Sequence, residues 1–316
     1  MGRTGKLRSR SLVFLLPAII LIVGFYIAPL IITAWISFTP LTNWKVKTEL
    51  GELVGIENYR SIYYMIKFDP DFKKILQTTI VFVVFTLIVN VLGGLVLAIL
   101  TFLIEERISL TFRLLWILPR MTPLAVFGLL WYYFFYGGPE GTLNSFALRL
   151  GLIEEPMKWG TDPALLPYSA WLIIIFINGL VGVSYGMIIF YSAFRNIPRE
   201  LIIAAKVDGA KTLDIIRYIL VPMVRWHIIF VTIWQLLSLL TSYMHLFVLV
   251  EWRVVDRWYG TTWALYVFNT AFSTVKNQGL AAAAAVILVI LGGLLGLLTL
   301  RVMRFNELIK PPKGDI

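Results

Sequence analysis

The chain has 316 residues, of which 59% are hydrophobic and 15% are charged, and its mean hydropathy is +0.82. Soluble domains usually contain about 25% charged residues, so this composition excludes a soluble enzyme. The absence of cysteine excludes disulfides, thiolate metal sites and a cysteine nucleophile. A net charge of +10 would suggest a nucleic-acid partner in a soluble protein, but it can equally reflect unequal charge on the two sides of a membrane.

Six apolar runs are long enough to cross a bilayer, which requires about 20 residues. They cover residues 12–38, 78–104, 112–136, 168–194, 226–250 and 280–303. Each run is apolar on consecutive residues, whereas strands of a membrane β-barrel alternate over about 10 residues. The sequence therefore predicts an all-α polytopic membrane protein with six transmembrane helices. These helices would form one membrane domain, 12–303, between tails at 1–11 and 304–316.

The distribution of basic residues predicts the orientation of these helices. With the N-terminus in the cytoplasm, the internal segments hold 14 Lys and Arg residues in 62 positions, against 11 in 99 positions outside. This bias matches the positive-inside rule, so both termini are expected in the cytoplasm. The net charge then needs no nucleic acid to explain it. The run at 12–38 exceeds the apolar core of a cleavable signal peptide, and we interpret it as an anchor.

Carboxylates are absent from all six runs. Many ion-coupled carriers place ionisable groups at membrane depth, so this absence argues against a carrier that works alone. Arg120 is the ninth residue of its run. Two interpretations of it stay open: an arginine that lines a gate, or, as we favour, one that snorkels to the inner surface.

Polar and small residues recur at helical spacing within two of the runs. The fifth run carries Gln235, Ser238, Ser242 and His245, and the fourth carries Asn178, Gly182 and Tyr185. At about 100° per residue, each set would lie on one narrow helical face that turns away from lipid. Two hypotheses remain open: the faces line the pathway of a polar uncharged solute, or they form hydrogen bonds between helices.

The longest internal segment, 195–225, is predicted to form two short helices. Asn196 is suited to cap the first helix, and Asp208-Gly209 is suited to end it. The second helix is expected over 212–220. The first helix has more apolar residues than a connector needs, which leaves two interpretations: it inserts into a groove of a partner protein, or it lies on lipid headgroups.

This segment contains I-A-A-K-V-D-G-A at residues 203–210, followed by Val221-Pro222. It resembles the cytoplasmic motif E-A-A-x-x-D-G-A of the permease subunits of binding-protein-dependent ATP-binding-cassette importers, most closely the carbohydrate-uptake type. Ile203 stands at the position of the glutamate. Further segments that resemble the family surround the motif in the expected order, at 53–59, 112–123, 141–144, 266–272 and 279–283.

The resemblance implies a transporter made of several subunits with different roles. This subunit would form half of a transmembrane pathway with a second permease, giving a heterodimer, in the cell membrane of a bacterium or archaeon. Two ATP-binding cassette subunits would carry ATP and Mg, and an extracytoplasmic solute-binding protein would deliver a sugar or related polar solute. The permease itself would do no covalent chemistry. The residues expected to couple it to the ATPase are Pro198, Glu200, Ile203, Ala204, Ala205, Asp208 and Gly209.

The residues alone leave two alternatives to this function. One is a secondary transporter that acts without an ATPase, and the other is a non-transporting membrane scaffold that binds a cytosolic partner through 195–225. The chain contains no G-x-x-x-x-G-K-[ST] motif, so no P-loop is available for it to bind ATP.

Overall fold

The computed structural model describes residues 15–273 and 276–302, which form helices joined by loops, with no strand among them. This confirms the predicted all-α class. The chain divides into two compact units. The first comprises Met1–Asp69 and Tyr266–Val289, and the second comprises Pro70–Leu265 and Ile290–Ile316. The predicted tails at 1–11 and 304–316 lie outside the described residues.

Within the residues that the structure describes, five helical segments are long and apolar enough to cross a membrane. They are Leu15–Ile36, Pro70–Leu103, Tyr168–Arg195, Arg225–Glu251 and Gln278–Val302. The sixth candidate, expected as one run over 112–136, is a pair of helices bent by 95°: Glu106–Met121 and Val126–Phe135. The bend falls at Thr122 and Pro123, which are extended, with ψ values of 128° and 137°. A proline disfavours helical conformation in the preceding residue, which explains the break.

In the first unit, Leu15–Ile36 includes a π-helical turn, Val23–Ile27, and α2, Ala28–Ile36. It is followed by α3, Val46–Glu49, and α4, Glu57–Phe68. The side chain of Asn58 in α4 donates hydrogen bonds of 2.9 Å to the carbonyls of Ser37 and Thr39. Gly279 lies against the same turn, and a Cβ there would collide with the Thr39 carbonyl. These contacts give Asn58 and Gly279, both in segments that resemble the family, a packing role.

The first unit also contains most of α16, Trp263–Phe272, and the first part of α17, Gln278–Val302. Gln278 donates to the carbonyl of Ala271 at 2.8 Å and accepts from the backbone N–H of Trp44 at 3.2 Å. The ring of Trp44 also lies 5.5 Å from the ring of Phe272. One buried amide therefore fixes the start of α17 to α16 and to the loop before α3.

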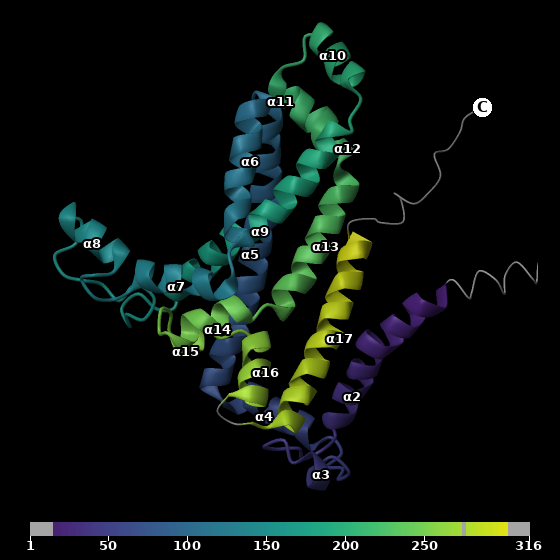
Figure 1. Cartoon of the computed structure of the whole chain (residues 1–316), viewed down its shortest axis with the longest axis vertical. Helices are drawn as coiled ribbons and strands as arrows, with labels where there is room; N and C mark the ends of the chain where they lie inside the picture. The colour runs from purple at the N-terminus through teal and green to yellow at the C-terminus, as the bar shows by residue number, and fades with distance from the viewer. Residues whose placement is uncertain (1–14, 274–275, 303–316) are drawn as a thin grey trace, which may run out of the picture. The chain divides into compact units, whose positions relative to one another are not determined.

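The core of the second unit is the pairing of α5, Pro70–Leu103, with α9, Tyr168–Arg195 (Figure 1). Buried side chains such as Phe82, Phe190 and Phe194 fill the interior of this unit. The two helices approach so closely that a Cβ on Gly94 would lie 2.9 Å from the Cα of Gly186. Small residues at this crossing allow the close backbone contact that membrane helix pairs favour.

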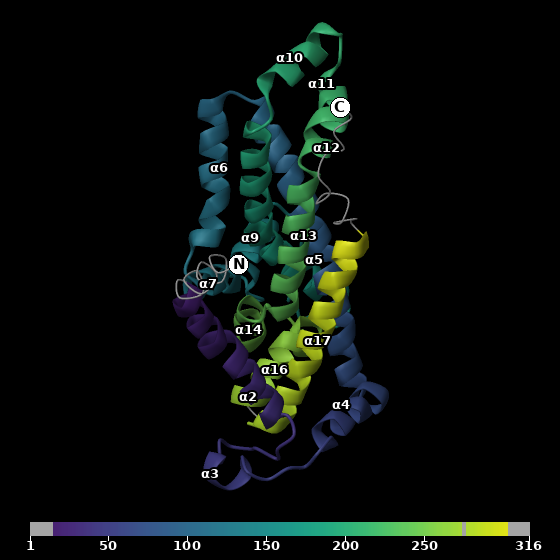
Figure 2. The same ribbon diagram turned by 90° about the vertical axis from the view of Figure 1, so that its right-hand side faces the viewer.

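Beside this pair, α6, Glu106–Met121, and α13, Arg225–Thr241, run roughly parallel to it (Figure 2). Further helices follow in the same unit: α7, Leu124–Phe135; α8, Thr142–Arg149; α10, Arg199–Val207; α11, Thr212–Ile215; α12, Val221–Met223; α14, Met244–Glu251; and α15, Arg257–Gly260. A π-helical turn, Ile216–Leu220, joins α11 to α12. At one end of the second unit, α10 and α11 lie beyond the long helices (Figure 1). The helices α5 and α9 end there, and α6 and α13 begin there.

Candidate functional site

The helix α10 projects beyond the ends of the long helices and is bounded by two fixed backbone conformations. Before it, Pro198 is extended, with φ −55° and ψ 127°; after it, Gly209 has φ +84°. The prediction that Asn196 caps this helix is wrong. Asn196 instead ends α9 by donating its backbone N–H to the carbonyl of Ala193, and Pro198 takes the position before α10. Proline suits that position because its fixed φ matches the geometry.

One side of α10 packs on the bundle and the other is free of contacts with the described residues. Ile202 and Ala205 pack against a buried cluster that includes Phe194 and Ile215. On the outer side, Val207 is 81% exposed and Ile203 is 59% exposed. Leu201 is also exposed, at 45%, so α10 presents three large exposed apolar side chains, and an apolar patch of this kind marks a site of interaction with a partner or a membrane.

The remaining coupling residues of the prediction lie on the outer side of α10 or at its ends. The exposed ones are Pro198, Glu200, Ala204, Asp208 and Gly209. Glu200 is in the first turn, where a carboxylate is favoured by the helix dipole. After Gly209, the carboxylate of Asp214 accepts a 2.9 Å hydrogen bond from the backbone N–H of Lys211 and fixes the start of α11. The structure therefore brings the predicted set together at one end of the second unit.

The polar residues predicted in the fifth run do not share one uninterrupted helical face. Hydrogen bonding of α13 ends at Thr241, Ser242 is extended with ψ 122°, and α14 begins at Met244. The spacing of about 100° per residue applies only within one continuous helix. It therefore no longer predicts that His245 lies on the same helical face as Gln235. Ser238 is exposed and Ser242 is half-buried.

Gln235 is 5% exposed and forms hydrogen bonds to two other long helices. Its side-chain oxygen accepts from Asn90 of α5 at 3.2 Å, and its amide nitrogen donates to the carbonyl of Gly182 of α9 at 2.9 Å. A Cβ on Gly182 would collide with the side chain of Asn90. For Gln235 and Gly182 this geometry favours packing between helices over a pathway. Sequence reasoning missed Asn90, although a lone amide in a long apolar run was available as a signal.

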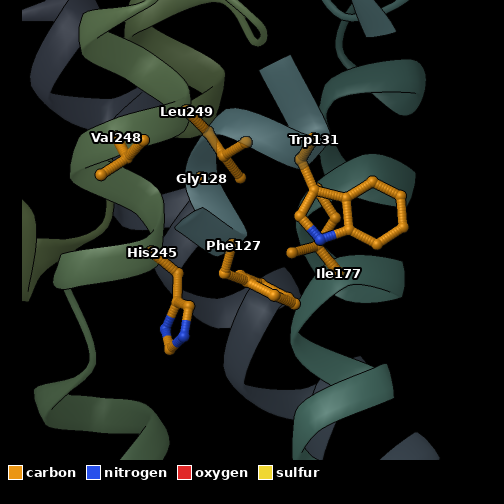
Figure 3. A pocket seen from close by; sticks show the side chains of 7 residues that line it. All are labelled: Phe127, Gly128, Trp131, Ile177, His245, Val248 and Leu249. Carbon is orange, nitrogen blue, oxygen red and sulfur yellow. The ribbon is translucent and has the colours of Figure 1, made fainter. Parts of the chain in front are cut away.

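His245 lies in a small, closed apolar pocket between α7, α9 and α14 (Figure 3). Its ring is 5.4 Å from the ring of Phe127 at an angle of 82°, and Trp131 and Ile177 complete the wall (Figure 3). Gly128 is required there because a Cβ would collide with Val248. His245 therefore contacts α7 rather than the other residues of its predicted set.

The two remaining α9 residues of the prediction, Asn178 and Tyr185, are half-buried. The ring of Tyr185 lies near two groups that sequence reasoning did not connect with it. The guanidinium of Arg120 lies 5.1 Å from its centroid, and the ring of Trp234 lies 6.2 Å away and nearly parallel, at 22°.

A charged cluster joins α6 to α9 next to the α10 end of the unit. The carboxylate of Glu106 lies 2.8 Å from Arg113 and 3.5 Å from Arg195. The hydroxyl of Tyr191 donates a hydrogen bond to the same carboxylate, and the guanidinium of Arg113 lies 3.6 Å from the centre of the Tyr191 ring. Among the described residues, no group of three or more His, Cys, Asp or Glu side chains is arranged to hold a metal ion.

The fold defines a multi-pass α-helical membrane protein with a short helix, α10, that projects at one end. The family model for the inner membrane component of binding-protein-dependent transport systems matches residues 90–305. The chain belongs to this family of transport subunits, as the motif at 203–210 predicts.

Two relatives and one solved structure are similar over much of the chain. A lactose transport system permease protein of Rhizobium radiobacter is 27% identical and covers 90% of this chain and 91% of its own length. A probable ABC transporter permease of Pyrococcus horikoshii is 32% identical over 67% of this chain and 68% of its own. A chain of a bacterial alginate ABC transporter, solved in complex with a pentasaccharide-bound periplasmic protein, has a TM-score of 0.76 at 17% identity. It covers 95% of this chain and 96% of its own, and shows that the fold is shared.

Proposed function

We propose that this chain forms half of the translocation pathway of an ATP-driven importer for a carbohydrate or a related polar solute. The similarity to a lactose permease supports the solute class. The second half would be another permease chain, and ATP and Mg would bind to two cassette subunits. An extracytoplasmic solute-binding protein would deliver the solute, and the solved relative in complex with a periplasmic protein supports this partner.

The observation that carries the proposal is the outer side of α10. Val207 and Ile203 expose apolar surface on a helix that is otherwise fixed to the bundle by Ile202 and Ala205. A rigid helix with an exposed apolar face is suited to enter a groove of a partner. Because α10 is anchored to the core formed by α5 and α9, movement of an ATPase bound there would be transmitted to the helices that cross the membrane.

The proposal includes an orientation. Counting the bent pair α6 and α7 as one span gives six crossings, so both termini lie on one side. We place α10 and both termini in the cytoplasm of a bacterial or archaeal cell, because the internal segments hold the excess of Lys and Arg.

The experiment compares Val207→Asp with Leu152→Asp. Both residues are strongly exposed, at 81% and 71%, but Leu152 follows α8, a helix that lies far from α10 in Figure 1. The complex is purified through a tag on this chain, and co-purified ATPase subunits and ATP-driven uptake of radiolabelled lactose, maltose and glycerol 3-phosphate into proteoliposomes are measured. We expect Val207→Asp to remove the ATPase subunits and uptake, and Leu152→Asp to retain the ATPase subunits. Solute uptake by this chain alone in ATP-free liposomes would contradict the proposal.

A further inference from the structure

Arg120 lies farther along its helix than its position in the apolar run suggested, and its side chain is exposed. The helix α6 begins at Glu106 rather than at residue 112, which places Arg120 about 21 Å along it at 1.5 Å per residue. Tyr185, which contacts Arg120, and Trp234, which stacks on Tyr185, fall in the middle third of Tyr168–Arg195 and of Arg225–Glu251, two segments long enough to cross the membrane. Snorkelling serves residues near the ends of spanning segments, so these neighbours favour the other interpretation left open by the sequence, an arginine that lines a path through the bundle.

The guanidinium of Arg120 stands at the end of a row of aromatic rings from two helices. Tyr185 of α9 is followed by Trp234 of α13, and Trp234 by Phe230 at 6.5 Å between centroids and 22° between planes. Trp234 is 53% exposed and Phe230 is 47% exposed. The row therefore presents open ring surface beside a cation.

The charge of Arg120 has no counter-ion within the described part of the chain. No ion pair or hydrogen bond joins its side chain to a described residue, and the six apolar runs contain no Asp or Glu. The contact with Tyr185 offsets only a small part of what it costs to hold a cation at this depth. An arginine in such a place is expected to face a water-filled path and to meet an anion there.

We propose that Arg120, Tyr185 and Trp234 form a subsite for an oxyanion-bearing sugar or polyol within the translocation pathway. The planar guanidinium binds a carboxylate or phosphate with two parallel hydrogen bonds. The exposed face of Trp234 packs against the C–H face of a sugar ring in the same solute. The subsite selects a charged carbohydrate over a neutral one. This inference rests on the proposed function, because a subsite of this kind requires a solute pathway through this chain.

The test uses two matched pairs of probes that differ in charge: glucuronate with glucose, and glycerol 3-phosphate with glycerol. Binding to the purified complete complex, without the solute-binding protein, is measured by calorimetry for the unaltered chain and for Arg120→Gln, Arg120→Lys and Arg149→Gln. Arg149 is an exposed arginine at the end of α8 and serves as the control. The two anionic probes distinguish carboxylate from phosphate as the preferred group.

We expect at least one anion to bind about tenfold or more tightly than its neutral counterpart, in keeping with a charge-assisted hydrogen bond. Arg120→Gln should remove this preference, Arg120→Lys should retain part of it, and Arg149→Gln should leave it unchanged. Equal binding of charged and neutral probes, or a preference that survives Arg120→Gln, overturns the inference. Loss of assembly in both Arg120 variants also overturns it, because the charge then belongs to an interface with another chain.

A second measurement separates this inference from the proposed function. ATP-driven uptake is measured in proteoliposomes that contain the complex and its solute-binding protein, with the same four probes and with lactose. ATP-driven uptake that ignores solute charge and is unaffected by Arg120→Gln refutes the subsite alone. Absence of any ATP-driven uptake by the unaltered complex refutes the proposed function and the subsite with it.

Discussion

The hydroxyl of Tyr191 donates a 2.8 Å hydrogen bond to the carboxylate of Glu106 and so joins the end of α9 to the first residue of α6. Arg113 binds the other oxygen of that carboxylate, also at 2.8 Å. Because α10, the proposed docking helix, begins only a few residues after α9 ends, these contacts connect α10 to α6, and α6 leads to the bend at Thr122 and Pro123.

The first prediction concerns this pair. Tyr191→Phe and Glu106→Gln should each lower the free energy of unfolding slightly, and in a double-mutant cycle the two substitutions together should cost less than the sum of the single effects. The small magnitude follows from the exposure of the Glu106 side chain, at 58%. Unfolding of the purified chain in detergent is followed by circular dichroism. Glu105→Gln is the control, and additive effects of the two substitutions would contradict the predicted coupling.

Much of the fold follows from the length of the apolar runs, but its breaks do not. The run at 112–136 is continuous in hydropathy, and only the local restriction imposed by Pro123 marks the 95° bend. No proline or glycine marks the break at Ser242 in the sequence. The predicted polar face of the fifth run therefore continued past the residue where the helix ends.

The candidate site was predicted unevenly for a physical reason. The docking helix is local in sequence, so its motif at 203–210 reports one continuous segment. The groups around Tyr185 come from α6, α9 and α13, and the partners of Gln235 come from α5 and α9. Such sets depend on how helices pack, which periodicity within a single helix does not contain.

The second prediction distinguishes two reasons for a glycine after α10. Gly209 has φ +84°, and a Cβ there would meet nothing within 4 Å, so its backbone conformation rather than crowding within this chain requires glycine. Asparagine tolerates this conformation better than alanine, and a β-branched residue tolerates it least. We therefore expect uptake per ATP hydrolysed to fall in the order Gly209, Gly209→Asn, Gly209→Ala, Gly209→Val. Full coupling in the valine variant would show that the conformation is not needed for docking.

The third prediction tests the close contact between α5 and α9. Gly182→Ala places a Cβ against the side chain of Asn90 and should lower stability by about 1 to 3 kcal/mol through overpacking. In Gly293→Ala, on α17, the added Cβ meets nothing within 4 Å, so this control should be neutral or slightly stabilising. Unfolding is measured as for Tyr191. Shortening the neighbour in an Asn90→Ala background should reduce the effect of Gly182→Ala, and an unchanged effect would contradict the packing described.

The fourth prediction is a pH dependence outside the membrane spans. The Glu49 carboxylate accepts hydrogen bonds from the backbone N–H and the hydroxyl of Thr42, at 2.7 and 2.9 Å. These bonds, the backbone bond first, hold the pKa of Glu49 below its ordinary value. A lowered pKa in the folded state means that the contribution to stability is present at neutral pH and is lost as the pH falls through that lowered value.

Protection of residues 42–49 against hydrogen exchange, measured relative to the intrinsic exchange rate at each pH, should therefore fall on acidification. Glu49→Gln should show less protection at neutral pH with a weaker dependence on pH. The control is Glu52→Gln, a nearby exposed carboxylate. An acid-dependent loss of protection that persists unchanged in Glu49→Gln would assign it to another group.

The fifth prediction compares neighbours in the chain that face different surroundings. Gln235 is 5% exposed and hydrogen-bonded to α5 and α9, whereas Trp234 is 53% exposed beside Tyr185. Gln235→Ala leaves buried polar groups without partners and should lower stability by about 1 to 3 kcal/mol, with less assembled complex. Trp234→Ala should assemble normally and lower solute uptake, because it removes ring surface from the proposed pathway. Assembly is measured by size-exclusion chromatography and uptake in proteoliposomes at equal amounts of complex. If Gln235→Ala assembled normally and lost uptake, packing between helices would no longer account for the burial of Gln235. The interpretation that Gln235 lines the solute pathway would then be favoured.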